Sequence, residues 1–217
     1  MEKNRNAQII AVLALIVGVV GLSVGFAAFS NTLKIQTTAD VTPDKSSFDV
    51  DFSSSDTEVA TDEITPIATP NSLVTSKATI DNTNEPTISN LKATFTEPGQ
   101  KVVYSFYAFN KGQLDAYLKS IVYGNVTGQT ANKICTAGEG TTDALVQKAC
   151  NGISVKVKVG NEAETTGSAA SIINHSLLKS TSEPVVVTIE YQADADRADG
   201  DFTVSFGDIT LNYSSVD

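Results

Sequence analysis

The sequence predicts an all-β protein: an antiparallel β-sandwich of jelly-roll or Ig-like type with one short helical insertion, preceded by a hydrophobic N-terminal helix. Short segments in which apolar and polar residues alternate recur along the chain, as in strands buried on one face. Turn-forming residues separate these segments at short intervals, which is typical of a sandwich. An uncharged run of 21 residues, 9–29, precedes them. We therefore expect two parts, residues 1–29 as a signal peptide or transmembrane anchor and residues 30–217 as one extracellular β-sandwich domain.

The uncharged run has the length of a membrane-spanning helix. Spanning takes about 20 apolar residues, whereas the apolar core of a removable signal peptide has about 7–15. Lys3 and Arg5 precede the run, and positively charged flanks stay in the cytoplasm. We therefore expect the N-terminus to be cytoplasmic before any cleavage and the rest of the chain to lie outside the cell or on its surface.

The end of the same run also fits a cleavage junction. Gly25, Phe26 and Ala27 form a small-x-small triplet of the kind that a signal peptidase accepts before its cut. Cleavage would fall between Ala27 and Ala28. Retention would instead keep residues 9–29 as the membrane anchor, so both outcomes remain open.

Strands are expected at short intervals along the remaining sequence. The segment 102–109 is apolar on both faces and is expected to be a central strand, whereas 153–159 alternates cleanly. Two polar stretches, 53–72 and 161–171, are expected to be loops. The expected strands are 33–37, 48–52, 78–80, 91–95, 102–109, 118–123, 153–159, 185–191, 202–206 and 209–213.

The two cysteines, Cys135 and Cys150, are expected to form a disulfide. An exported domain meets an oxidising compartment, where this pairing is the usual state. The segment that they enclose ends in a predicted short helix with Thr141 or Thr142 as its N-cap. We expect the bridge to fix this helical insertion to the strand that begins near Ile153.

No constellation of catalytic residues is recognisable, and we do not expect an enzyme. His175 is the only histidine, so zinc proteases with two histidines on one helix turn are excluded, and we expect an ordinary surface or edge histidine. The formal net charge of −10 opposes binding to nucleic acid, whose phosphates carry the same sign.

The acidic segment 193–202 is the one candidate for a bound ion. Calcium binds several oxygen ligands from a tight loop, and four aspartates lie within this stretch. Ala198 occupies the place of a third ligand in an EF-hand loop, and Asp199-Gly200 is also a common hairpin turn. A calcium site and a solvated turn are therefore both considered, with no other cofactor expected. The candidate ligands are Asp194, Asp196, Asp199 and Asp201.

Two stretches resemble a known family. FAAFSNTLKIQTTADV, from Phe26, resembles the signal-peptide end and mature start of the TasA/camelysin (SipW-dependent) biofilm-matrix proteins of Gram-positive bacteria. The segment 91–125 resembles their central part, in which a Pro-Gly turn precedes a long strand that ends in Asn-x-Gly. Here the matching positions are Pro98-Gly99, Asn110 and Gly112.

The resemblance implies a jelly-roll-like sandwich, exported by a dedicated signal peptidase, that self-associates into extracellular fibres. In such fibres the mature N-terminal strand of one subunit completes a sheet of the next, and here that donor strand would be about residues 28–41. Phe29, Leu33 and Ile35 would supply its apolar side chains. The insertion between the cysteines and the loop 53–72 do not belong to the pattern.

Two other functions follow from the same sequence. An uncleaved chain would be a membrane-anchored surface domain that stays monomeric and binds a partner or a glycan. Alternatively, the apolar helix would pack in the core of a pilin-like filament, although the glutamate usual near the start of such helices is missing. The strand 33–41 would then pair within its own domain.

Overall fold

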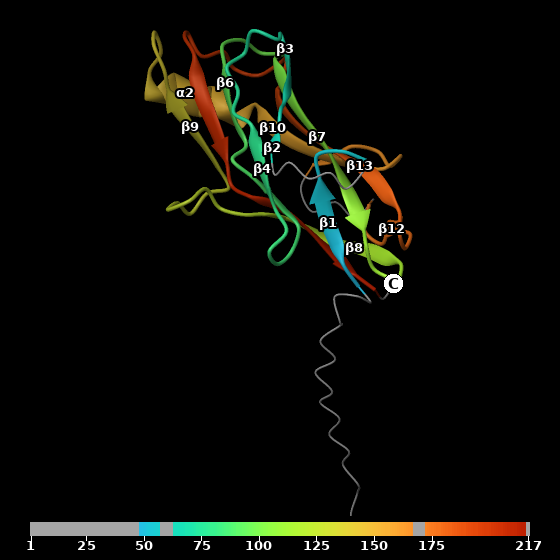
Figure 1. Cartoon of the computed structure of the whole chain (residues 1–217). Coiled ribbons are helices and arrows are strands. Elements are labelled where there is room, and N and C mark those ends of the chain that lie inside the picture. The colour runs from blue at the N-terminus through green and yellow to red at the C-terminus, as the bar shows by residue number, and fades with distance from the viewer. Residues whose placement is uncertain (1–47, 57–62, 167–171, 216–217) are drawn as a thin grey trace, which may run out of the picture. The chain divides into compact units, whose positions relative to one another are not determined.

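The structure, a computed structural model, describes residues 48–56, 63–166 and 172–215 (Figure 1). This part of the chain forms antiparallel sheets and one short helix, α2 (Asp143–Asn151), which confirms the predicted antiparallel all-β character. The strands are β1 (Val50–Ser53), β2 (Glu63–Ile64), β3 (Ile67–Thr69), β4 (Ala78–Asp81), β5 (Thr87–Ser89), β6 (Lys92–Phe95), β7 (Lys101–Asn110), β8 (Ala116–Tyr123), β9 (Lys133–Ala137), β10 (Ile153–Val159), β11 (Thr165–Thr166), β12 (Ser176–Leu177), β13 (Ser182–Tyr191), β14 (Phe202–Phe206) and β15 (Ile209–Ser214).

The first sheet is organised around two ten-residue strands, β7 and β13. Its order is β1-β7-β13-β10-β11, and β3 also pairs with β7. The ladder between β7 and β13 runs from Phe109 opposite Ser182 to Lys101 opposite Glu190. On the other side of β7, β1 pairs with the C-terminal end of that strand and β3 with its N-terminal end. The predicted interior strand at 102–109 is thus confirmed in position.

The chain passes between the second and third sheets at two short bends. Their orders are β12-β8-β15-β5-β4-β2 and β6-β14-β9. Asn90, with a φ of 60°, and Leu91 join β5 to β6, while Gly207 and Asp208 join β14 to β15. A side chain at Gly207 would collide with the backbone of Gly124, so only glycine fits this bend.

The core lies between the first sheet and the other two. Tyr191 of β13 meets the ring of Phe202 of β14 edge to face, with 5.3 Å between the ring centroids. Tyr104 of β7 donates its hydroxyl to the carbonyls of Ser76 and Lys92, in and beside β6. Buried residues of all three sheets form one cluster, which is the arrangement expected of a β-sandwich.

Some element predictions were wrong. The stretches expected as loops contain the short strands β2, β3 and β11, because Ile64 and Thr165 turn inward and bring the backbone within reach of β4 and β10. The short strands β5, β9 and β12 were not predicted at all. Although the sequence of β7 is apolar on both faces, only one of its faces is buried, because buried residues alternate with partly or fully exposed ones.

The disulfide between Cys135 and Cys150 is present, which confirms the predicted pairing. It joins α2 to β9, the strand before the helix, and not to β10 as expected (Figure 1).

The helix α2 begins after Thr142, which is the N-cap residue, with an extended backbone but no capping hydrogen bond from its side chain. Lys133 of β9 donates to the carbonyls of Cys150 and Ile153, each at 2.8 Å, and so closes the C-terminal end of the helix. Burial lowers the pKa of this lysine.

Asn110 ends β7 and fixes the turn that follows. Its side chain is fully buried and donates to the carbonyls of Leu114 and Leu177, while its oxygen accepts the amide of Gly112. One amide group therefore satisfies backbone groups from the loop after β7 and from the edge strand β12.

Replacement of Asn110 by alanine should lower the free energy of unfolding by about 2–4 kcal/mol, since buried backbone groups lose their partners. Urea denaturation measures this difference. Asn84→Ala, at an exposed position, is the control and should change stability by about 0.5 kcal/mol or less. Equal effects of the two substitutions would contradict the role given to Asn110.

Replacement of both cysteines by serine should lower the free energy of unfolding by about 3 kcal/mol, because the bridge closes a loop with a sequence separation of 15 residues. Thermal denaturation of the oxidised chain and of the double variant checks this. A reducing agent should destabilise the original protein and leave the variant unchanged. A reductant that affects both equally would argue against the bridge as the cause.

Candidate functional site

The predicted cleavage and donor-strand residues lie outside the described part of the chain. These are Ala27, Ala28, Phe29, Leu33 and Ile35, together with the apolar run 9–29. Within residues 48–56, 63–166 and 172–215, no helix has the length and apolar character needed to cross a membrane.

The acidic segment is held mainly through its backbone. The Tyr191 hydroxyl donates to the carbonyl of Asp196 at 2.6 Å and accepts the amide of Ala198 at 3.3 Å. The carbonyl of Asp201 accepts the amide of Gly138, which ties the segment to the end of β9. Burial raises the pKa of Tyr191, so the phenol remains a neutral donor. The turn is therefore anchored on the core side by one tyrosine.

The described residues contain no group of three or more histidine, cysteine, aspartate or glutamate side chains placed to hold a metal ion. Asp194, Asp196, Asp199 and Asp201 are thus near in sequence without forming such a group. The calcium hypothesis stays a prediction, because a loop of aspartates can rearrange around an added ion.

The only histidine lies between two glutamates, an arrangement that the sequence analysis did not predict. His175 places Nδ1 3.2 Å from Glu162 Oε1 and Nε2 2.6 Å from Glu183 Oε2. The side chains of His175 and Glu183 are 19% and 12% exposed, whereas that of Glu162 is 44% exposed. Both ring nitrogens donate only in the imidazolium form, so the geometry fits a positive ring between two carboxylates.

A turn, a connecting segment and a strand bring this cluster together. Glu162 lies in the turn after β10, His175 directly before β12, and Glu183 near the start of β13. Gly160 has a φ of +54°, and a Cβ there would lie 2.9 Å from Glu183 Oε2. The missing side chain of this glycine therefore leaves the room that the carboxylate occupies.

The inner side of the cluster is buried and incompletely satisfied. Glu183 Oε1 and the hydroxyl of Tyr213 are buried without a hydrogen-bond partner in the described structure. Burial raises the pKa of Glu183, although the hydrogen bond and charge of His175 act in the opposite direction. Burial, and to a smaller extent the charge of Glu183, raises the pKa of Tyr213 well above its usual value. The imidazole is thus the main group that compensates the buried carboxylate.

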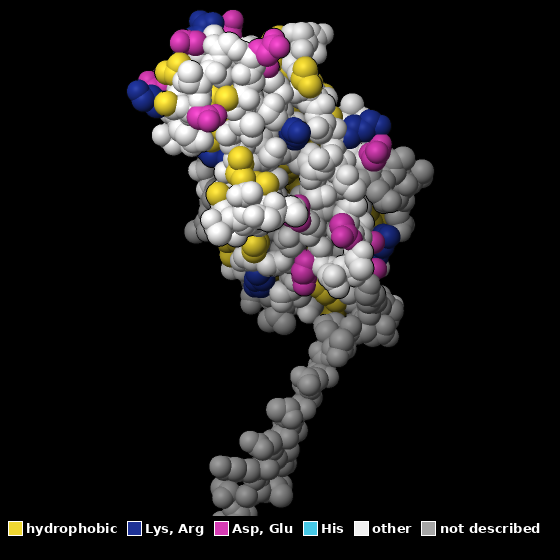
Figure 2. All heavy atoms as spheres, turned by 90° about the vertical axis from the view of Figure 1, so that its left-hand side faces the viewer, with side chains coloured by type: hydrophobic (Ala, Val, Ile, Leu, Met, Phe, Trp, Pro, Cys, Tyr) yellow, Lys and Arg dark blue, Asp and Glu magenta, His cyan; other side chains and the backbone are white. Residues whose placement is uncertain are grey.

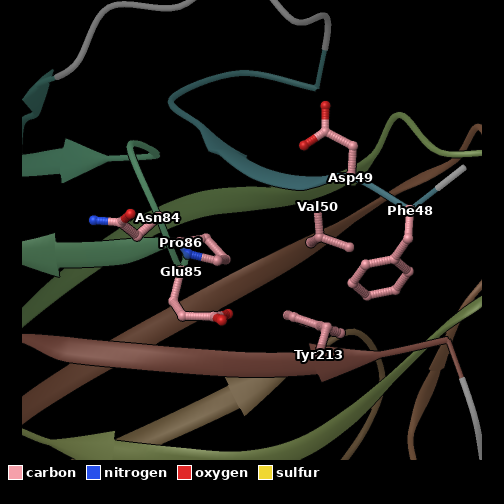
Figure 3. Close-up of a pocket in the computed structure, with 7 residues that line it drawn as sticks. All are labelled: Phe48, Asp49, Val50, Asn84, Glu85, Pro86 and Tyr213. Carbon is pink, nitrogen blue, oxygen red and sulfur yellow. The ribbon is translucent and has the colours of Figure 1, made fainter. Parts of the chain in front are cut away.

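A small pocket lies beside the first described strand (Figure 3). It has a volume of about 140 Å³. In Figure 3, the side chains of Phe48 and Val50 point toward Tyr213, whereas Asp49 points away. The lining residues are Phe48, Asp49, Val50, Asn84, Glu85, Pro86 and Tyr213. The pocket therefore has an apolar floor next to the place where β1 begins.

The edge of the second sheet at β8 is only partly covered. This strand has eight residues, and β12 pairs with Ala116 and Tyr117 only. The backbone of Leu118 makes two further bonds, to His175 and Asn174. In the described structure, residues 120–122 pair with β15 on one side, Lys119 lies at a shift in that register, and residues 119–122 pair with no strand on the other side.

The outer faces of the second and third sheets carry pairs of threonine hydroxyls. Thr94 and Thr203 lie 2.8 Å apart across β6 and β14, and Thr87 and Thr210 lie 3.0 Å apart across β5 and β15. Figure 2 shows a face with scattered charged side chains and separate small groups of hydrophobic ones.

No protein-family model, curated protein or solved structure matches this chain.

Tyr191→Phe should lower the free energy of unfolding by about 1–2 kcal/mol, because the buried amide of Ala198 loses its acceptor. Chemical denaturation measures the loss. Tyr117→Phe, on the partly exposed side of β8, is a matched control that should have little effect. A Tyr191→Phe protein as stable as the original would show that the hydroxyl does not anchor the turn.

A calcium site at the acidic segment predicts that about 1 mM Ca²⁺ raises the melting temperature, since a ligand that binds only the folded state stabilises it. The double substitution Asp196→Asn and Asp199→Asn should then abolish the increase. A solvated turn instead predicts the same melting temperature with and without the ion.

Proposed function

We propose that this chain is an exported, non-enzymatic structural protein of the bacterial cell surface or biofilm matrix that assembles into fibres by donor-strand addition. Its domain would be a jelly-roll-like sandwich that accepts an extended segment from a neighbouring copy. The resemblance of residues 26–41 and 91–125 to fibre-forming matrix proteins supports this proposal, as do the antiparallel sheets and the disulfide.

The observation that carries the proposal is the partly covered edge at β8. Backbone N–H and C=O groups along residues 119–122 have no strand partner on one side within the described chain. An exposed edge of this kind is a template for another extended segment, whose main chain completes the hydrogen-bonding ladder. Val122, 46% exposed, adds an apolar contact at the same edge.

The proposed donor is residues 28–41. Leu33 and Ile35 alternate with Lys34 and Gln36, so an extended chain would present its apolar side chains on one face. Side chains at alternate positions give specificity in strand addition by filling pockets. Phe29, nearer the N-terminal end of the same segment, would provide a third apolar contact.

A membrane-anchored surface domain is the second candidate. The uncharged run of 21 residues favours it, because that length matches a permanent span better than a removable signal. Its binding surface would be the hydroxyl-bearing outer face around Thr94 and Thr203, where a neutral partner such as a glycan would meet little charge. This candidate predicts an intact N-terminus and fractionation with membranes.

Two substitutions on one face of the donor segment test the first proposal. Leu33→Glu together with Ile35→Glu should abolish fibres, because charged side chains cannot fill apolar pockets. Lys34→Glu together with Gln36→Glu changes the opposite face of the same strand and should leave fibres intact. Electron microscopy of secreted protein compares the two variants with the original chain.

The mature N-terminus decides between the two candidates. Mass spectrometry of fibre protein should find chains that begin at Ala28. Fibres built from chains that still begin at Met1 or Glu2 would overturn the donor-strand proposal. Protein found only as an uncleaved monomer in membranes would favour the anchored domain.

A further inference from the structure

We propose that His175, held between Glu162 and Glu183, is a pH-sensitive latch that keeps residues 172–177 on the edge of β8 and releases them when the imidazole loses its proton. This inference does not require fibre formation, although it concerns the same β8 edge, because it describes how a segment of the chain itself is held there. It rests on the geometry of the cluster and on the short pairing of the segment that the cluster holds.

The segment 172–177 covers the edge of β8 through few backbone contacts. The amide of Leu118 donates to the carbonyl of His175 at 3.0 Å, and the amide of Asn174 donates to the carbonyl of Leu118 at 2.7 Å. Beyond these, β12 contributes only two paired residues. Such short pairing opens at low free-energy cost unless side chains add to it.

The side chains that strengthen this pairing are apolar at both ends of the segment 172–177 and ionic in its middle. Ile172 and Leu177 are 1% and 2% exposed, so both are anchored in the core. Between them, His175 reaches Glu162 and Glu183 with its two ring nitrogens. The ring thus connects the segment to the turn after β10 and to β13, neither of which pairs with it through the backbone.

The charge of the ring decides whether this connection holds. As an imidazolium it donates to both glutamates and places a positive charge between two negative ones. As a neutral imidazole it donates to one carboxylate only, and the other then faces a lone pair. Tyr213 of β15 adds no charge, and Lys119 of β8 donates to the amide oxygen of Asn174. Loss of the proton therefore leaves two carboxylates near each other, one of them mostly buried.

Burial raises the pKa of Glu183 above the ordinary value of 4.5, because its carboxylate loses hydration, while the hydrogen bond and charge of His175 act against this rise. While the ring is charged, the Glu183 carboxylate has a partner of opposite charge. When the ring becomes neutral, the same carboxylate is left without that partner, so the cluster weakens at this step. The latch is closed at acidic pH and opens toward alkaline pH.

Hydrogen exchange of the full chain between about pH 5 and pH 9, a range that brackets the usual histidine pKa, tests the latch. Protection factors of the Leu118 and Asn174 amides report on the segment. Those of Gly138 and Phe206, in and beside the third sheet, correct for global opening. The ratio of the first pair to the second should fall about tenfold or more as His175 loses its proton, which its NMR signals record in the same samples.

Two variants complete the test. His175→Gln keeps polar hydrogen-bonding groups but does not titrate, so its ratio should lose the step that accompanies titration of the histidine. Glu183→Gln removes the buried charge, so its segment should stay protected at alkaline pH, and this variant serves if His175→Gln fails to fold. Lys158→Gln, which removes a charge from β10 outside the cluster, is the control and should keep the original pH dependence.

The same step in His175→Gln as in the original chain would overturn the latch. A neutral imidazole at a pH where the two amides are still fully protected would do so as well. Neither result depends on fibre formation, so the latch and the proposed function fail or stand separately.

Discussion

The ladder between β7 and β13 is the constraint on which the other elements depend. It pairs two ten-residue strands along almost their whole length, and β10 extends it on the far side of β13. The inward side chains of these strands, such as Tyr104 and Tyr191, contact the third sheet through a hydroxyl and a ring. Since every residue of a strand shares its register, a slip of one position would turn these side chains to solvent and lose the core at once.

The polar clusters lie where that ladder ends. Asn110 closes β7 at one end, and its amide bonds to the backbone of β12. Glu183 lies at the start of β13, opposite Ala108 of β7, and meets His175 beside the same short strand. Two buried polar groups therefore converge on β12, the strand that covers part of the β8 edge. Because unsatisfied buried polar groups are expensive, each group favours one placement of this covering segment.

The sequence was sufficient to predict the long strands and the disulfide bond. Alternation over residues 153–159 predicted β10 because its lysines and serine lie on the wet face, and two cysteines in a chain expected to be exported predicted the bridge. Short strands such as β2 and β12 escaped prediction, because two residues carry no period and their pairing is imposed by neighbours. The cluster around His175 also escaped, since Glu162 and Glu183 are ordinary acidic residues in sequence. A lone histidine in a chain without catalytic partners was the only signal, and nothing local showed which carboxylates would reach it.

The bridge between β9 and α2 also bears on the order in which the molecule is made. The chain grows from its N-terminus, so both cysteines are synthesised before β10, β13 and β14 exist. The bridge joins neighbours in sequence, whereas the main ladder must wait for strands that are far apart. The third sheet then adds β14 as its middle strand, between β6 and β9, after β9 has already been tied to its helix. In a compartment that oxidises thiols during chain entry, the growing protein would thus acquire a covalently closed corner before its central strands could meet.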